Sequence, residues 1–193
     1  MEKRFSSEIN SLLSGRQITL QDAVDSFRER SFAVLFLILM LTPALPLPTG
    51  GFTHIFELIV MLLSLELVVG QKTPWLPRRW LRLKLPGIRD RSGRTKFIKA
   101  VRWIEARASG KNYELQNNIL ARRGIGLIVF ILAGFAFIAP PFSGLDTLPS
   151  LGVVVLSLGL IFKSPFLEIT GPLIGSIGIG LIVLLGRFAL SMF

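Results

Sequence analysis

The strongest constraint on this chain is a gapless internal repeat, in which residues 31 to 67 match residues 124 to 160 after a shift of 93 positions. Each copy consists of an apolar run, a break rich in proline and glycine, and a second apolar run. The two copies share ten identical residues. Because apolar runs match one another easily, the most informative identities are those in the break, Pro48 with Pro141 and Gly51 with Gly144. Duplicated, broken apolar helices recur in membrane transporters, where the broken backbone lines a binding site.

Charge and hydrophobicity are segregated along the chain. The sequence is 51% hydrophobic, yet it carries a formal net charge of +10. Residues 72 to 111 alone hold thirteen Lys or Arg against two acids, Asp90 and Glu105, which gives +11. The remainder is nearly neutral and mostly apolar. This composition predicts an integral membrane protein with one strongly basic aqueous segment.

The same composition limits partners and cofactors. A basic segment beside apolar helices meets anionic lipid headgroups before it meets nucleic acid, so a membrane surface is the favoured partner and no nucleic acid is expected. The chain has no cysteine and one histidine, His54, which excludes disulfides, cysteine-based zinc sites and a histidine-rich metal site within one chain. We expect no cofactor and no metal. The first thirty residues alternate in charge and predict no cleavable signal peptide.

The predicted fold is an all-α integral membrane protein of two repeated broken-helix hairpins, a C-terminal transmembrane helix and amphipathic interfacial helices. Its predicted segments are amphipathic N-terminal helices at 1–30, the first hairpin at 31–70, a basic segment at 71–123, the second hairpin at 124–163 and the C-terminal helix at 164–193.

The apolar runs are short for a bilayer. The first keeps about 13 residues free of proline, or roughly 20 Å of helix, against a hydrocarbon core of roughly 30 Å. The third and fourth runs, 125–139 and 148–162, are also near 15 residues each, and only 171–193 is comfortably long. The hairpins therefore either cross fully or are re-entrant, with tips that stop inside the membrane. We favour tips at least partly within the membrane, covered by protein or water.

Lys and Arg placement predicts the orientation. Basic residues flank both hairpins, whereas the tips at 42–53 and 140–149 contain none. Both hairpins then enter from the cytoplasmic side of a bacterial inner membrane, residues 72–123 are cytoplasmic, and the copies are parallel rather than inverted. The glycines of the last helix permit close helix packing, which predicts a homodimer.

The basic segment begins with a motif typical of a membrane interface. A tryptophan pair with arginines beside it follows the first hairpin, and amphipathic positions continue from Phe97 to Ile104. The predicted membrane-surface residues are Trp75, Arg78, Arg79, Trp80 and Arg82.

Several strings together resemble the ExoD family of bacterial inner-membrane proteins linked to exopolysaccharide synthesis. They are Leu45-Pro-Leu-Pro-Thr-Gly-Gly51, the helix ending in Gly70, the motif Pro74-Trp-Leu-Pro-Arg-Arg79, the segment from Ile18 to Arg30, and the block from Leu148 to Leu160. The likeness covers nearly the whole chain. It departs at Glu66, where the family commonly has glutamine, and at Lys163-Ser164, where an Arg-Asp pair is usual. The resemblance implies a process and assigns no reaction.

Ionisable residues inside apolar runs are functional hypotheses, because each is expensive in lipid. His54 and Glu57 lie one helical turn apart on a shared face, while Glu66 points about 180° away. A buried Glu has a raised pKa and can bind and release a proton in a carrier. The structural alternatives are a cap or headgroup contact for His54, pairing of Glu66 with Arg78, Lys163 or Arg187, and a helix cap for Asp146.

The candidate substrate and proton site joins the paired tips to these ionisable groups. Its residues are Pro46, Pro48, Gly50, Gly51, His54, Glu57, Glu66, Pro140, Pro141, Gly144 and Asp146. No catalytic constellation, phosphate-cradling loop or nucleotide fingerprint occurs, so an enzyme is not expected. The predicted function is a non-enzymatic transport-type component of exopolysaccharide synthesis or export. The alternative is an accessory scaffold whose basic face docks anionic lipid or a polysaccharide-synthesis enzyme.

Overall fold

The computed structural model describes residues 30–45, 53–71, 73–75, 99, 119–140 and 143–191. Within these residues the chain forms five α-helices and no strand. The expected amphipathic helices at 1–30 and most of the basic segment lie outside the described residues. The helices are α3 (Ser31–Leu41), α4 (Thr53–Val69), α7 (Ile119–Ile138), α8 (Thr147–Phe162) and α9 (Pro165–Ser191).

Two of these helices are long and apolar enough to cross a membrane, judged by length and composition. They are Ile119–Ile138 and Pro165–Phe188, whereas α3 and α8 are shorter apolar helices. The expectation that only the last run is long enough is corrected by α7, whose 20 residues begin before Arg122 and Arg123. The predicted apolar run began after these arginines, whereas the helix includes them. The Arg122 guanidinium donates a hydrogen bond to the Gln71 carbonyl oxygen at 2.7 Å.

Helix α3 forms the centre of the packed helices rather than an outer surface. Its sequence is apolar on every side, and nearly all of its side chains, from Phe32 to Met40, are buried. A helix that is hydrophobic all round needs neighbours on all sides. The main core combines α3 with buried residues of α4, α7 and α8.

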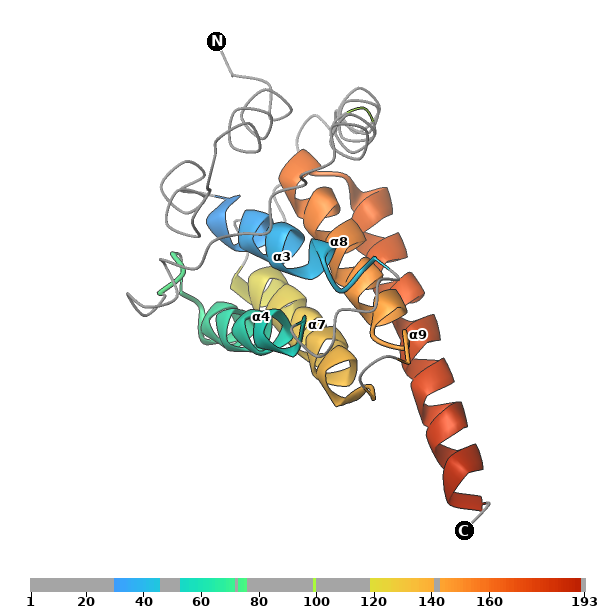
Figure 1. Ribbon diagram of the computed structural model, residues 1–193. Helices are drawn as coiled ribbons and strands as arrows, with labels where there is room; N and C mark the ends of the chain where they lie inside the picture. The colour runs from blue at the N-terminus through green and yellow to red at the C-terminus, as the bar shows by residue number, and fades with distance from the viewer. Residues whose placement is uncertain are drawn as a thin grey trace.

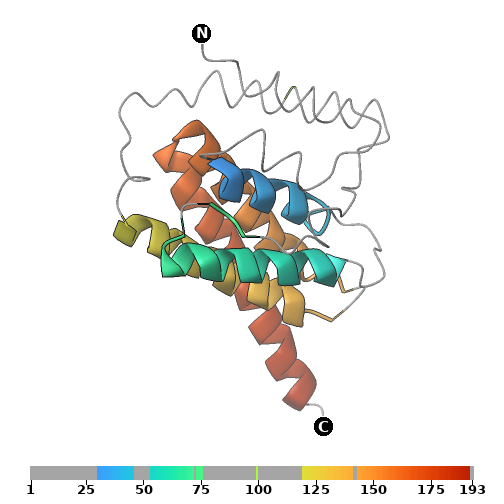
Figure 2. The same ribbon diagram turned by 90° about the vertical axis from the view of Figure 1, so that its left-hand side faces the viewer.

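The first helix of each hairpin packs mainly on the second helix of the other hairpin. Helix α4 lies along α7, and α3 lies against α8, while α8 makes its most extensive contact with α9. In Figures 1 and 2, α3 and α4 run across the long direction of α9, and the C-terminal part of α9 projects beyond the other helices. Exposed apolar side chains there include Leu184 and Phe188.

Glycines on α8 and α9 bring these two helices into backbone contact. An added Cβ at Gly152 would lie 2.7 Å from the Gly175 Cα, and one at Gly171 would lie 2.6 Å from the Leu156 backbone nitrogen. Positions Gly180 and Gly186, further along α9, have open space around them. The close packing expected of the last helix is therefore used within the chain, by its N-terminal half.

Helices α4 and α8, the second helices of the two predicted hairpins, share most of the face that α4 buries. Beyond Thr53, every residue that α4 buries has a buried counterpart 93 positions later in α8. The pairs are Phe56 and Pro149, Glu57 and Ser150, Ile59 and Gly152, Val60 and Val153, Leu63 and Leu156, Ser64 and Ser157, and Leu67 and Leu160.

The two second helices also end in the same way. Gly70 has φ +98, and Gln71 N–H donates to the Glu66 carbonyl oxygen at 3.0 Å. Ninety-three positions later Lys163 has φ 53, and the Ser164 N–H donates to the Gly159 carbonyl oxygen at 2.9 Å. This left-handed residue with a hydrogen bond back across the last turn closes many helices.

Candidate functional site

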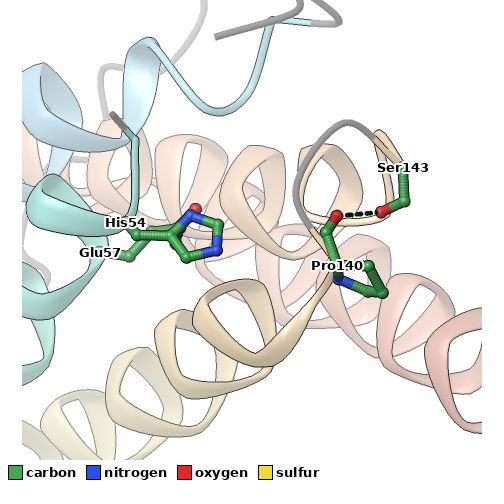
Figure 3. Close-up of polar contacts among 4 residues, drawn as sticks. All are labelled: His54, Glu57, Pro140 and Ser143. Atoms are coloured by element: carbon green, nitrogen blue, oxygen red, sulfur yellow. Dashed lines mark hydrogen bonds and ion pairs between the residues drawn. The ribbon is translucent and has the colours of Figure 1, made fainter. Parts of the chain in front are cut away.

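His54 and Glu57 stand on the first turns of α4, directly after the first proline-glycine break. Their spacing of three residues places both side chains on one face, and the His54 Nδ1 lies 3.4 Å from the Glu57 Oε2. The His54 ring also contacts Phe137 near the end of α7, with ring centroids 5.5 Å apart. Figure 3 shows this pair facing the chain that leaves α7 at Pro140. The start of α4 therefore lies beside the second break.

Glu57 is the most unusual side chain of the site, because it is 0% exposed. Neither of its carboxylate oxygens has a hydrogen-bond partner among the described residues, and the same holds for the His54 Nδ1. Burial of a carboxylate without a hydrogen bond or a paired charge is strongly unfavourable. At 3.4 Å, the contact with His54 is an ion pair only when the imidazole is protonated. The burial of Glu57 is therefore less unfavourable when its own carboxylate or the His54 imidazole carries a proton.

The second break forms a compact turn beside this pair. The Ser143 hydroxyl donates to the Pro140 carbonyl oxygen at 2.6 Å and accepts from the Leu145 N–H at 3.2 Å. Gly144 adopts φ +67, a backbone conformation that favours glycine. The Thr147 N–H then donates to the Gly144 carbonyl oxygen at 3.3 Å. These bonds hold the turn that leads into α8.

Asp146 occupies the N-cap position of α8, as the capping interpretation expects, but its side chain makes no capping hydrogen bond. Burial raises the pKa of this carboxyl, while the backbone N–H of Asp146, the neighbouring His54 and the backbone N–H of Thr147 act in the opposite direction. Asp146 in turn interacts electrostatically with Glu57. The turn therefore places a second carboxyl group, that of Asp146, near the pair of His54 and Glu57.

Glu66 lies near the other end of α4 and has a structural contact. Its Oε2 accepts a hydrogen bond from the Trp75 backbone N–H at 2.7 Å. This partner differs from the arginine and lysine partners considered from the sequence. Because the bond ties the chain after Gly70 back onto α4, Glu66 stabilises the exit from the first hairpin. The Trp75 side chain itself is exposed.

The structure leaves part of the predicted site undescribed. One end of the helices holds five of the predicted site residues: His54, Glu57, Pro140, Gly144 and Asp146. Glu66 lies at the other end. The remaining predicted tip and membrane-surface residues lie outside the described residues: Pro46, Pro48, Gly50, Gly51, Pro141, Arg78, Arg79, Trp80 and Arg82. The described part of the chain contains no group of three His, Cys, Asp or Glu side chains that could hold a metal ion.

Two buried polar groups were missed from the sequence. Ser150 is 0% exposed, and its hydroxyl oxygen has no hydrogen-bond partner within the described residues. Ser150 is also the counterpart of Glu57 in the internal repeat, so the alignment of the two copies could have found it. The second group is Glu168 in the first turn of α9, whose Oε1 is likewise buried without such a partner. Glu168 has no counterpart in the matched copies.

Comparison with known proteins places this arrangement in a family. A family profile described as "Exopolysaccharide synthesis, ExoD" matches residues 5–184. The chain belongs to the ExoD family. Membership implies involvement in exopolysaccharide synthesis, as the resemblance of its motifs indicated.

Two curated relatives extend this comparison. Protein ExoD of Rhizobium meliloti is 28% identical over 158 residues, which cover 77% of this chain and 62% of that protein. The Synechocystis protein slr1875 is 24% identical over 146 residues, which cover 76% of this chain and 68% of that protein. This ExoD-family chain thus spans about two thirds of the length of the curated relatives it matches. No solved structure matches it.

Proposed function

We propose that this ExoD-family protein is a multi-pass component of a bacterial inner membrane that moves an exopolysaccharide-related substrate without catalysing a reaction. The observation that carries the proposal is that the start of α4, which follows the first break, lies beside the end of α7, which leads into the second break. His54, at the start of α4, contacts Phe137, at the end of α7, and the buried Glu57 lies beside them. Ionisable groups beside broken helices are typical of transport sites.

The short helices are compatible with this proposal. Irregular backbone at membrane depth is tolerated where protein or water covers it. Helix α3 has only 11 residues, about 16 Å of helix, and is buried among its neighbours. We therefore propose that the hairpins are re-entrant, and that α7 and α9 span the bilayer. The apolar side chains on the projecting part of α9 would face lipid.

We further propose that the two hairpins are related by an internal two-fold pseudosymmetry. Exchanging the copies turns the packing of α4 on α7 into the packing of α8 on α3, and both pairings are extensive. The shared buried faces and the shared left-handed ends at Gly70 and Lys163 support the same relation. Under this symmetry the two tips form one composite substrate site.

The test of function uses a deletion strain complemented with variants of the two tips. Gly144→Val disturbs a turn that requires φ +67, whereas Gly180→Val changes a glycine with open space around it. A carrier loses exopolysaccharide output with Gly144→Val at normal membrane abundance and keeps it with Gly180→Val. The scaffold alternative predicts the opposite sensitivity, with output lost on joint neutralisation of Arg78, Arg79 and Arg82 while Gly144→Val and Glu57→Gln remain silent.

Topology and assembly are tested separately. We propose that residues 72–123 are cytoplasmic, that the basic segment contacts anionic lipid headgroups, and that the protein is a homodimer. Reporter fusions after Arg94 with periplasmic activity would overturn the orientation. Native mass measurement in mild detergent that detects monomer alone would overturn the dimer.

A further inference from the structure

We propose that His54 and Glu57 form a proton relay, in which His54 exchanges a proton with the aqueous side and Glu57 holds it inside the protein. The relay specifies the coupling site of the proposed carrier and rests on that proposed function. Glu66 is not part of it, because it lies near the other end of α4, where its carboxylate accepts a hydrogen bond from the Trp75 N–H.

The exposures of the two side chains differ in the way a relay requires. The His54 side chain is 24% exposed, whereas that of Glu57 is 0% exposed. His54 therefore stands between the surface of the protein and the buried carboxyl. Since the His54 Nδ1 and the Glu57 Oε2 are 3.4 Å apart, a small side-chain rotation brings them within hydrogen-bond distance.

The proton transfer balances in charge and atoms. Protonation of His54 at Nε2 from the aqueous side gives an imidazolium, which pairs with the Glu57 carboxylate. Transfer of the Nδ1 proton to Oε2 then leaves a neutral imidazole and a neutral carboxyl. The neutral carboxyl avoids the large penalty of a buried charge without a hydrogen bond. Reversal of these steps returns the proton to the aqueous side.

One other ionisable group faces the pair from the described neighbouring elements. Asp146, on the turn between α7 and α8, interacts electrostatically with both His54 and Glu57. Helices α3 and α7 contribute no ionisable side chain at this end, because Arg30 lies at the start of α3 and Arg122 and Arg123 lie at the start of α7. The negative charge of Asp146 favours proton uptake by the pair.

Only the first of the two repeated copies carries a carboxyl group at the position of Glu57. The position of Glu57 is occupied in α8 by Ser150, which is equally buried and also lacks a hydrogen-bond partner among the described residues. A serine hydroxyl does not change charge at physiological pH, so one copy carries the titratable group. Ser150 consequently offers a matched control for Glu57: same helix position, same burial and no proton to exchange.

The sole histidine of the chain makes the relay directly observable. Protein carrying nitrogen-15 in its histidine ring, purified through a histidine-free tag into lipid nanodiscs, gives ring signals from His54 alone. When two interacting groups titrate, each senses both steps. We expect one more pH-dependent step in the wild type and in Ser150→Ala than in Glu57→Gln, because Asp146, which also interacts with His54, is present in all three proteins. Glu57→Asp, which keeps the carboxyl on a shorter side chain, should retain the additional step with a smaller separation.

Identical titrations in the wild type, Glu57→Gln and Glu57→Asp would overturn the relay, and would leave the proposed transport function standing. A second measurement compares exopolysaccharide output across external pH in the complemented deletion strain. Glu57→Gln and His54→Asn should flatten the pH profile, while Ser150→Ala should preserve it. An unchanged profile in both relay variants would also overturn the proposal. Failure of the transport function itself is recognised separately, by silent variants of the Gly144 tip.

Discussion

The crossing of α8 and α9 at Gly171 allows a sharp test of the packing. In Gly171→Ala the new Cβ would lie 2.6 Å from the Leu156 nitrogen and 2.7 Å from the Gly152 carbonyl oxygen. These are backbone atoms, so no side chain can rotate away. Ordinary van der Waals contact begins at 3.4 Å, and 3.4 minus 2.6 requires the helices to separate by about 0.8 Å locally.

The expected magnitude follows from two opposing effects. Overpacking of a well-packed contact costs about 1–3 kcal/mol. Alanine in place of glycine in a helix interior gains up to about 1 kcal/mol. Gly180→Ala, on the same helix but with open space around it, experiences the second effect alone. We therefore expect Gly180→Ala to be neutral or stabilising and Gly171→Ala to be about 1–3 kcal/mol less stable than Gly180→Ala.

The assay is SDS-induced unfolding in mild detergent, followed by circular dichroism, with both variants measured beside the wild type. The double variant Gly152→Ala/Gly171→Ala adds a further check. Because both glycines serve one contact, the helices separate once, and the double variant should lose less stability than the sum of the single losses. Equal stability of Gly171→Ala and Gly180→Ala would refute the close crossing.

Two further predictions concern the helix ends. Lys163→Gly should stabilise the protein by about 1 kcal/mol in the same unfolding assay, because Lys163 has φ 53, whereas Gly70→Lys should destabilise it at φ +98. Asp146→Asn should stabilise the protein at neutral pH, because burial raises the pKa of Asp146 and the folded state then binds more protons than the unfolded state. That gain should vanish as pH falls below the ordinary pKa of Asp, about 3.9, and a gain independent of pH would contradict the reasoning.

The repeat made the second helix of each hairpin the most predictable part of the fold. The runs 52–69 and 148–162 correspond closely to α4 and α8 because glycine and proline at their starts and turn residues at their ends are local signals. The shared face of His54 and Glu57 was also predictable, since a spacing of three residues fixes it in any helix. Local geometry sufficed for these features.

Other features depended on contacts that no local pattern reveals. Helix α9 begins at Pro165, six residues before the apolar run, because proline suits a first helical turn and Glu168 is accommodated against Gly159. The glycines of α9 were expected to permit close helix packing, but the partner helix, which for Gly171 is α8, depends on tertiary packing, and the homodimer stays a prediction. The burial of Ser150 has no signal in the apolar run itself, and only its alignment with Glu57 in the internal repeat could have indicated it.

Helix α9 also explains why the two copies diverged where they did. Gly152 and Gly159 of α8 lie against α9, and an added Cβ at Gly159 would lie 2.7 Å from the Glu168 nitrogen. Their counterparts in α4 are Ile59 and Glu66. Of these two helices only α8 packs on α9 at backbone distance, so glycine is required at these two positions in α8 and not in α4. Freed from that requirement, the first copy uses the position of Glu66 to bind the Trp75 N–H and fix the following chain. The equivalent ends of α4 and α8 thus contact different neighbours, the chain at Trp75 and helix α9.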